Sequence, residues 1–267
     1  MHLSRTAVAV TLLAAITTLV PPFAALAQSG NPPEPPALSA YWSPDVKRWE
    51  PIVLEYAPAR GLDPDLVAAV IWKESLGRAT SRGPVGAVGL MGLMPFDWRP
   101  SPEELQNPWT NVFWGARALA HTIRDGDGDL FYALAAYNGG WKQTHLRVTR
   151  RYATEVLSDY TRAVAVRHGL PADGDWVAIF AVEGTPDPQT ITVLGPQRRL
   201  ARYTERPLAR SDIPSVPAGT APHTTAITFV NGHGVECQVH VWLVSCDGSP
   251  ITPTSSQAAA AAKHDGQ

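Results

Sequence analysis

The chain has 267 residues, of which 45% are hydrophobic and 17% charged, a composition that fits a globular protein with one or two domains and excludes a wholly disordered chain. The formal net charge is −2 at pH 7, so the chain as a whole has no electrostatic attraction to nucleic acid, and we expect no nucleic-acid partner.

The first 27 residues predict a signal peptide. Arg5 is followed by the apolar run 6–20 and by "ALA" at 25–27, a small-x-small cleavage site before Gln28. An uncleaved membrane anchor is the alternative, but the run is short for a span, and Pro21 and Pro22 interrupt it. We expect an exported protein, in the periplasm, the cell wall or outside the cell, without stable membrane insertion after cleavage.

A Pro-rich linker is expected over 28–40, followed by a mainly helical domain over 41–170. Three helices are predicted to begin at a cap followed by proline: Ser43-Pro44, Asp63-Pro64 and Asn107-Pro108. Two more helices are expected over 129–140 and 149–168, and a glycine-rich loop over 81–100. The motif "DGDGD" at 125–129 lacks the glycine and glutamate of a calcium loop, which favours a tight turn.

From 171 to 250 the pattern changes to period two with β-branched residues, which predicts strands at 176–184, 190–195, 224–230 and 235–246. A linker is expected within this region, over about 196–222, and a disordered tail over 251–267. The fold class is therefore α+β, mainly α followed by a small β-rich C-terminal region. We found no internal repeat.

Cys237 and Cys246 are the only cysteines, and in an oxidising compartment two cysteines usually pair. Both lie in what reads as one extended strand, where nine residues span about 30 Å, far beyond disulfide reach. A disulfide is the expectation, and it requires a sharp bend in the strand.

Glu74 is the main candidate for chemistry. It shares a helical stripe, at spacings of three and four, with the aliphatic residues Leu66, Val67, Val70 and Ile71. Burial and the negative end of the helix dipole both disfavour the ionised carboxylate and raise its pKa, as a general acid near neutral pH requires. The alternative is a surface residue on the last turn.

Three motifs resemble those of the soluble lytic transglycosylases (SLT-type), whose catalytic domain is lysozyme-like. They are Glu74-Ser75, then "GAVGLMG" at 86–92, then "AAYNGG" at 135–140. The approach helix "GLDPDLVAAVIWKES", the segment "NPWTNVFWGARAL" and the closing helix "TRRYATEVLSDY" are also similar, so the resemblance covers roughly 41–168.

The resemblance implies that the glycan strand of peptidoglycan is the substrate and that the MurNAc-GlcNAc bond is cleaved with formation of 1,6-anhydro-MurNAc. Glu74 would act as the single general acid and base, whereas most glycosidases use two carboxylates. No second acidic residue stands out beside Glu74 in the sequence. The resemblance implies no cofactor and no metal, and the eight histidines show no metal-ligand spacing.

The resemblance also carries over substrate-binding roles for residues that match the family's motifs: Ser75, Leu90, Met91, Tyr137, Asn138 and Tyr152. Ser75 would orient the glutamate, and Leu90 and Met91 would line the cleft. Each residue has a structural alternative, such as a helix-end serine or ordinary core. The chain departs from the family at Gly92, where glutamine is usual, and at Val148, where glutamate is usual. Trp98, in the glycine-rich stretch, is a further candidate for a sugar contact.

Two other functions stay open. One is a muramidase of goose-lysozyme type, or a chitinase, that uses water and needs a second carboxylate. The other is a non-catalytic cell-wall-binding protein on the same scaffold, which Gly92 favours and Glu74 disfavours. In each case the β region could bind the wall or a protein partner.

Overall fold

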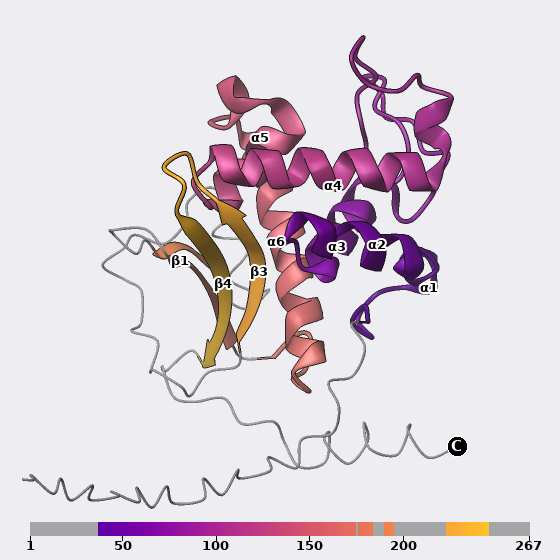
Figure 1. The fold of residues 1–267 in the computed structure, drawn as a ribbon. Helices are drawn as coiled ribbons and strands as arrows, with labels where there is room; N and C mark the ends of the chain where they lie inside the picture. The colour runs from indigo at the N-terminus through magenta and orange to yellow at the C-terminus, as the bar shows by residue number, and fades with distance from the viewer. Residues whose placement is uncertain (1–36, 175, 184–189, 195–222, 246–267) are drawn as a thin grey trace, which may run out of the picture. The chain divides into compact units, whose positions relative to one another are not determined.

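The computed structural model describes residues 37–174, 176–183, 190–194 and 223–245 (Figure 1). The expected signal peptide, most of the Pro-rich linker, the linker at 196–222 and the tail lie outside the described residues, as does Cys246. The described residues belong to one compact unit.

The helical part contains six α-helices in sequence order (Figure 1). They are α1 Pro44–Lys47, α2 Glu50–Tyr56, α3 Pro64–Ser75, α4 Pro108–Asp125, α5 Leu130–Gly139 and α6 Arg147–Arg167. Three short 3-10 helices lie between them: η1 Pro58–Arg60, η2 Glu104–Gln106 and η3 Trp141–Gln143.

Side-chain caps fix the starts of three helices. The Asp63 carboxylate accepts a hydrogen bond from the Asp65 amide at the start of α3, and the Asn107 side chain accepts from Trp109 and Thr110 at the start of α4. Both caps confirm the sequence-based prediction. Asp129 caps α5 in the same way, by accepting from the Tyr132 amide, and the "DGDGD" stretch turns tightly before it.

The single helix predicted to begin at Ser43-Pro44 is wrong in two respects. Ser43 makes no side-chain cap, and the segment divides into α1 and α2 at Arg48 and Trp49. Pro51 explains the break, because it has no N–H to continue the helix and its ring clashes with the carbonyl four residues earlier.

Four strands form one antiparallel sheet, in the order β2-β1-β4-β3. Their bounds are β1 Trp176–Glu183, β2 Thr190–Leu194, β3 His223–Val230 and β4 Glu236–Ser245, which confirms the four predicted strands. In the central pair, Ala178 faces Leu243, Phe180 faces Val241 and Val182 faces Val239. These six side chains are buried and make one face of the sheet apolar.

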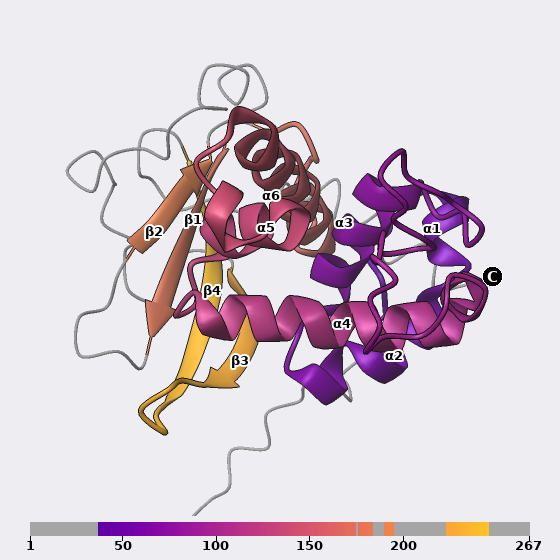
Figure 2. The ribbon, with the colours of Figure 1, turned by 90° about the horizontal axis from the view of Figure 1, so that it is seen from above.

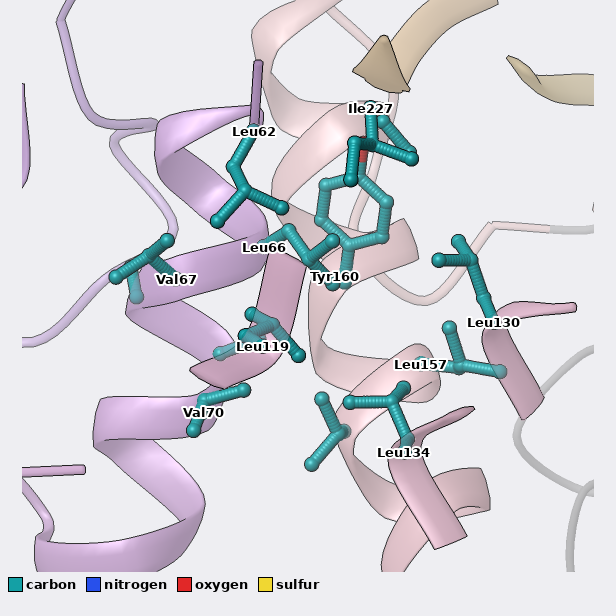
Figure 3. Close-up of a cluster of buried hydrophobic side chains, with 14 of the residues drawn as sticks. Leu62, Leu66, Val67, Val70, Leu119, Leu130, Leu134, Leu157, Tyr160 and Ile227 are labelled. Atoms are coloured by element: carbon teal, nitrogen blue, oxygen red, sulfur yellow. The ribbon is translucent and has the colours of Figure 1, made fainter. Parts of the chain in front are cut away.

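This apolar face packs on the helices and shares one hydrophobic core with them. Figure 2 shows the sheet beside α5 and α6, and the rings of Tyr160 on α6 and Phe180 on β1 lie 6.4 Å apart, centroid to centroid. Figure 3 shows the centre of the core, where Leu66 and Val70 of α3 lie near Leu157 and Tyr160 of α6. The expected α+β fold class is confirmed.

The helical part also completes the edge of the sheet. Thr228 on β3 donates its amide to the Gly61 carbonyl at 2.9 Å, and the Asp63 amide donates to the Ala226 carbonyl at 2.9 Å. Leu62 thus pairs with Ile227 as an antiparallel bridge. The segment before α3 therefore covers backbone groups that an edge strand would otherwise leave unpaired.

Cys237 lies on β4 as a free, fully buried thiol, and its expected partner Cys246 lies outside the described residues, so the expected disulfide stays a prediction. Because β4 is continuous from Glu236 to Ser245, it lacks the sharp bend that pairing requires. Within the described part of the chain, none of the helices combines the length and apolar character needed to cross a membrane.

Candidate functional site

The glycine-rich stretch forms a tight hairpin close to the end of α3. Val88 and Leu93 exchange both backbone hydrogen bonds at 2.9 Å, and the loop between them is Gly89-Leu90-Met91-Gly92. Asn111, fully buried on α4, holds this loop from inside. Its side-chain oxygen accepts from the Met91 amide at 2.8 Å, and its side-chain nitrogen donates to the carbonyls of Val88 and Leu105.

Gly92 of this hairpin lies directly against the carboxyl group of Glu74. A Cβ atom added to Gly92 would lie 2.2 Å from Glu74 Oε2 and 2.6 Å from its Cδ, which is closer than atoms can approach. Gly92 also has φ +60, a conformation that favours glycine. The residue that departs from the family pattern therefore leaves room for the acid in its present position.

Glu74 lies in the last turn of α3 and is mostly buried. Burial raises the pKa of its carboxyl group to about 7, although the Tyr152 hydroxyl and the charge of Lys73 oppose this shift. The carboxyl group can therefore exchange its proton near neutral pH, as a group that both gives and takes a proton requires.

Two tyrosine hydroxyls lie near Glu74, and one of them has a hydrogen-bond partner. Tyr137 on α5 donates its hydroxyl to the Met91 carbonyl at 2.9 Å. Tyr152 on α6 is 5% exposed, and its buried hydroxyl has no partner at hydrogen-bond geometry. Burial and the Glu74 charge raise the pKa of both hydroxyls, so both stay protonated. The Tyr152 hydroxyl is thus a donor held beside the acid without a fixed acceptor.

A pocket of about 300 Å³ adjoins this site between α3, α5 and α6. Its lining consists of Lys73, Asn138, Val148, Arg151, Tyr152 and Glu155. Two predicted substrate-binding residues, Asn138 and Tyr152, are therefore brought together in one cavity. Glu74 itself is not part of the lining and adjoins the pocket through Tyr152.

The other predicted substrate-binding residues lie deeper. Ser75 is 1% exposed, and its hydroxyl lies 2.9 Å from the Leu90 carbonyl and 3.0 Å from the Ile71 carbonyl, so it fastens the hairpin to α3 and makes no bond to Glu74. Leu90 and Met91 are fully buried in the core, and Met91 packs against Gly115 on α4. In this structure these three residues support the site from below and do not face solvent.

Sequence reasoning missed the charged part of the pocket. Glu155 on α6 accepts hydrogen bonds from Lys73, next to Glu74, and from Arg151. These bonds hold the pKa of the Glu155 carboxyl below its usual value despite partial burial. The i,i+4 spacing of Arg151 and Glu155 predicts their pair, but Lys73 comes from a distant helix.

Trp98, the candidate for a sugar contact, is exposed and belongs to an aromatic cluster beyond the hairpin. Its ring stacks on Phe96 at 5.7 Å between centroids, and the Arg99 guanidinium lies 4.6 Å from the centre of the Trp98 ring. No group of three or more potential metal-binding side chains occurs among the residues that the structure describes.

The helical part of the chain matches a known domain family. Residues 51–157 match the model of the transglycosylase SLT domain. The match includes α3, the hairpin, α4, α5 and the first half of α6, which lines the pocket. The helical part of the chain is therefore similar to an SLT domain over these residues, and the small antiparallel sheet follows it.

Several curated proteins are similar over this same part of the chain. A transglycosylase of Enterobacteria phage PRD1 is 37% identical over 100 residues, which are 37% of this chain and 37% of that protein. An endo-type membrane-bound lytic murein transglycosylase A of Klebsiella pneumoniae is 38% identical over 96 residues, 30% of this chain and 47% of that protein. The chain thus spans about a third to a half of the length of these relatives.

Solved structures of lytic transglycosylases show a more distant likeness. An inactive mutant of the lytic transglycosylase Slt from Pseudomonas aeruginosa is 25% identical, with a TM-score of 0.38 over 43% of this chain and 23% of that chain. The 70 kDa soluble lytic transglycosylase of Escherichia coli is 21% identical, with a TM-score of 0.40 over 46% of this chain and 25% of that chain.

Proposed function

We propose that this protein is a peptidoglycan lytic transglycosylase of the cell envelope, with Glu74 as its single acid and base. The observation that carries the proposal is the position of Glu74, whose carboxyl group is mostly buried against Gly92 with a pKa raised to about 7. The SLT-type domain and the enzymes named among its relatives support this reading.

The reaction needs one carboxyl group in two protonation states. Protonated Glu74 gives its proton to the glycosidic oxygen between MurNAc and GlcNAc, and the electrons of the breaking C1–O bond go to that oxygen. The N-acetyl carbonyl oxygen of the same MurNAc stabilises the cation at C1. The 6-hydroxyl then bonds to C1, and ionised Glu74 takes its proton, so the product is 1,6-anhydro-MurNAc and no water is consumed.

The neighbours of Glu74 fit this sequence of charges. Tyr152 has a buried hydroxyl without a fixed partner and can donate either to the carboxylate or to the N-acetyl oxygen. Asn138 lines the adjoining pocket and offers an amide to a sugar hydroxyl. Ser75, Leu90 and Met91 hold the hairpin in position.

A hydrolase on the same scaffold is the second candidate, and Glu155 is the observation that favours it. This carboxylate lines the pocket, is kept ionised by Lys73 and Arg151, and could activate water as a second carboxylate.

Mass spectrometry of purified peptidoglycan distinguishes these functions. The chain from Gln28 onward is incubated with the polymer beside its Glu74→Gln and Glu155→Gln variants. We expect anhydromuropeptides from the unmodified chain and from Glu155→Gln, and none from Glu74→Gln. Reducing-end products that disappear in Glu155→Gln would establish the hydrolase. Intact glycan that nevertheless retains the protein would establish a binding protein.

A further inference from the structure

Asn111 is a buried polar side chain in an apolar part of α4. It is 0% exposed, and both Val112 beside it and Ala116 in the next turn belong to the hydrophobic core. Burying an amide is unfavourable unless hydrogen bonds replace those it made with water, so an aliphatic residue would suit this position better unless the amide has a role. Its three hydrogen bonds all leave α4, two for the hairpin and one for the Leu105 carbonyl.

These bonds fix the backbone of the hairpin from the side of α4. Asn111 Oδ1 accepts from the Met91 amide at 2.8 Å. Its Nδ2 donates to the Val88 carbonyl at 2.9 Å and to the Leu105 carbonyl at 2.7 Å, so both hydrogens of this nitrogen are used. A Cβ atom added to Gly89 would lie 2.0 Å from Asn111 Nδ2. The amide and the hairpin backbone are therefore in direct contact, and neither can shift alone.

The same helix also holds the Met91 side chain. Gly115 follows Asn111 by one turn on the same face of α4, and a Cβ atom added to it would lie 2.3 Å from Met91 Sδ. Backbone and side chain of Met91 are thus both positioned by α4. The peptide group between Met91 and Gly92 is therefore fixed as well, and its carbonyl accepts from the Tyr137 hydroxyl at 2.9 Å.

Gly92 connects this arrangement to the acid. Because a Cβ atom added to Gly92 would lie 2.2 Å from Glu74 Oε2, the carboxyl group rests directly on the Gly92 backbone. A displacement of Met91 also moves Gly92, since a planar peptide group keeps consecutive Cα atoms about 3.8 Å apart. Asn111 therefore reaches Glu74 through the backbone of the hairpin, although it lies outside the three family motifs.

We propose that Asn111 is a positioning residue of the reaction, which fixes the hairpin backbone at Met91 and Gly92 so that the Glu74 carboxyl group is held within reach of the glycosidic oxygen. The inference rests on the proposed function for its reaction. Its effect on turnover comes from geometry, because a displacement of a reacting group by about 1 Å can lower the rate about a hundredfold.

Steady-state kinetics of the chain from Gln28 onward test the proposal, with soluble peptidoglycan fragments as substrate. We expect Asn111→Ala to lower kcat by about tenfold to a hundredfold and to change KM by less than about twofold, because the acid is displaced while the pocket stays intact. Urea unfolding gives the folded fraction for which kcat is corrected.

Thr161→Val is the matched control. Thr161 is 1% exposed, but its hydroxyl bonds the carbonyls of Leu157 and Ser158 in its own helix, α6. Its loss should lower stability, as the loss of Asn111 does, and should leave kcat unchanged.

A second variant acts on Met91 without removing a hydrogen bond. Gly115→Ala places a Cβ atom against Met91 Sδ, and alanine favours a helix more than glycine does, so α4 itself should remain stable. We expect kcat to fall by about threefold to tenfold. In the double variant with Asn111→Ala the two factors should not multiply, because both act through Met91. If Asn111→Ala does not fold, a lowered kcat in Gly115→Ala supports the proposal and an unchanged one overturns it.

A measurement without turnover separates this inference from the proposed function. Burial raises the pKa of Glu74 to about 7, so the unmodified chain should lose stability between about pH 5 and pH 8 relative to Glu74→Gln. If Asn111→Ala lets the carboxyl group move toward water, this loss should shrink to about half or less. Urea unfolding with and without Asn111→Ala measures it. A smaller loss in a protein that forms no anhydromuropeptides would remove only the proposed reaction.

Four outcomes would overturn the proposal. Two concern single variants: the same corrected kcat for Asn111→Ala and Thr161→Val, or a rise in KM without a fall in kcat. The third is a pair of factors that multiply fully in the double variant. The fourth is a lowered kcat with an unchanged pH-dependent loss of stability, which would show that Asn111 acts by a route other than the position of Glu74.

Discussion

The two ends of α3 hold buried carboxylates in opposite ways. At the N-terminal end, Asp63 and Asp65 are 5% and 0% exposed, and both bind the guanidinium of Arg167. Asp63 also accepts from the Tyr160 hydroxyl, and Asp65 from the Trp42 indole. At the C-terminal end, Glu74 has no cation bound to it and is stabilised only by a nearby hydroxyl and the charge of Lys73.

The difference teaches which buried acids are available for chemistry. A carboxylate that is paired with a cation and hydrogen-bonded stays ionised and fixes the structure, since removing its partner would leave a buried charge. A carboxylate that is buried without such pairing exchanges a proton near neutral pH. Asp63 and Asp65 are buried and Glu74 is largely buried, so the main difference between the two ends of the helix lies in the partners of the carboxylates.

The largest expected effect is the loss of activity when Glu74, at the C-terminal end of α3, is replaced. Glu74→Gln keeps the size of the side chain but removes the proton-transfer group, so we expect turnover to fall by at least about a thousandfold. Release of anhydromuropeptides over time measures it. Stability to urea should be unchanged or higher, and a variant that retains a tenth of the activity would exclude Glu74 as the only acid.

At the N-terminal end of α3, loss of the cation should lower stability and leave activity unchanged. Arg167→Met leaves two buried carboxylates without their cation and should lower the free energy of unfolding by about 3 kcal/mol. Urea unfolding measures the change, with Arg124→Met, at an exposed residue of α4, as the control. The folded fraction of Arg167→Met should turn over normally; a loss of less than about 1 kcal/mol would contradict a structural role for the cluster.

A side chain at the hairpin should displace the acid. Gly92→Ala places a Cβ atom on the Glu74 carboxyl, and we expect turnover to fall by about tenfold to a hundredfold because the acid shifts. Gly86→Ala is the matched control, since Gly86 also has positive φ but open space around its Cβ position. Equal losses of turnover in the two variants would attribute the effect to backbone strain alone.

The smallest effect concerns pH. The pKa of Glu74 is raised from 4.5 to about 7 in the folded state, so the folded protein binds this proton more tightly than the unfolded chain. Its contribution to stability is fully present below about pH 4.5 and is lost as the pH rises through about 7.

We therefore expect the unmodified protein to lose about 2 kcal/mol between pH 5 and pH 8 relative to Glu74→Gln. Urea unfolding of both proteins at each pH measures the difference. Parallel stability curves would show that the pKa of Glu74 is not raised. The same shift predicts that turnover declines above about pH 7, where the acid is ionised.

The features that sequence predicts well are those set by local chemistry. Asp63-Pro64 and Asn107-Pro108 start helices because the cap and the proline act within one turn. The four strands follow from alternation along each segment. Ser43-Pro44 has the same local signal, yet Ser43 makes no cap, so the signal permits a capping bond without ensuring one.

The features that sequence does not predict depend on contacts between distant segments. Leu90 and Met91 match a cleft-lining pattern but are buried, because Gly115 on α4 leaves room for the Met91 side chain. Lys73 and Glu155 meet only because α3 and α6 pack together. In the sequence, the glycine at position 92 reads as the loss of a sugar-binding glutamine. In the structure, Gly92 lies against the Glu74 carboxyl group and leaves room for it, which the sequence does not predict.

The backbone pairing of Gly61–Asp63 with β3 affects how this protein can be divided. A shortened chain that ends after α6 would lose the strand bound to Leu62 and would expose the core side chains that now face Phe180 and Ile227. Although residues 51–157 suffice for recognition of the family, they would make a poor expression fragment, prone to aggregate. Anyone who transplants the helical part into another protein should therefore move the sheet with it.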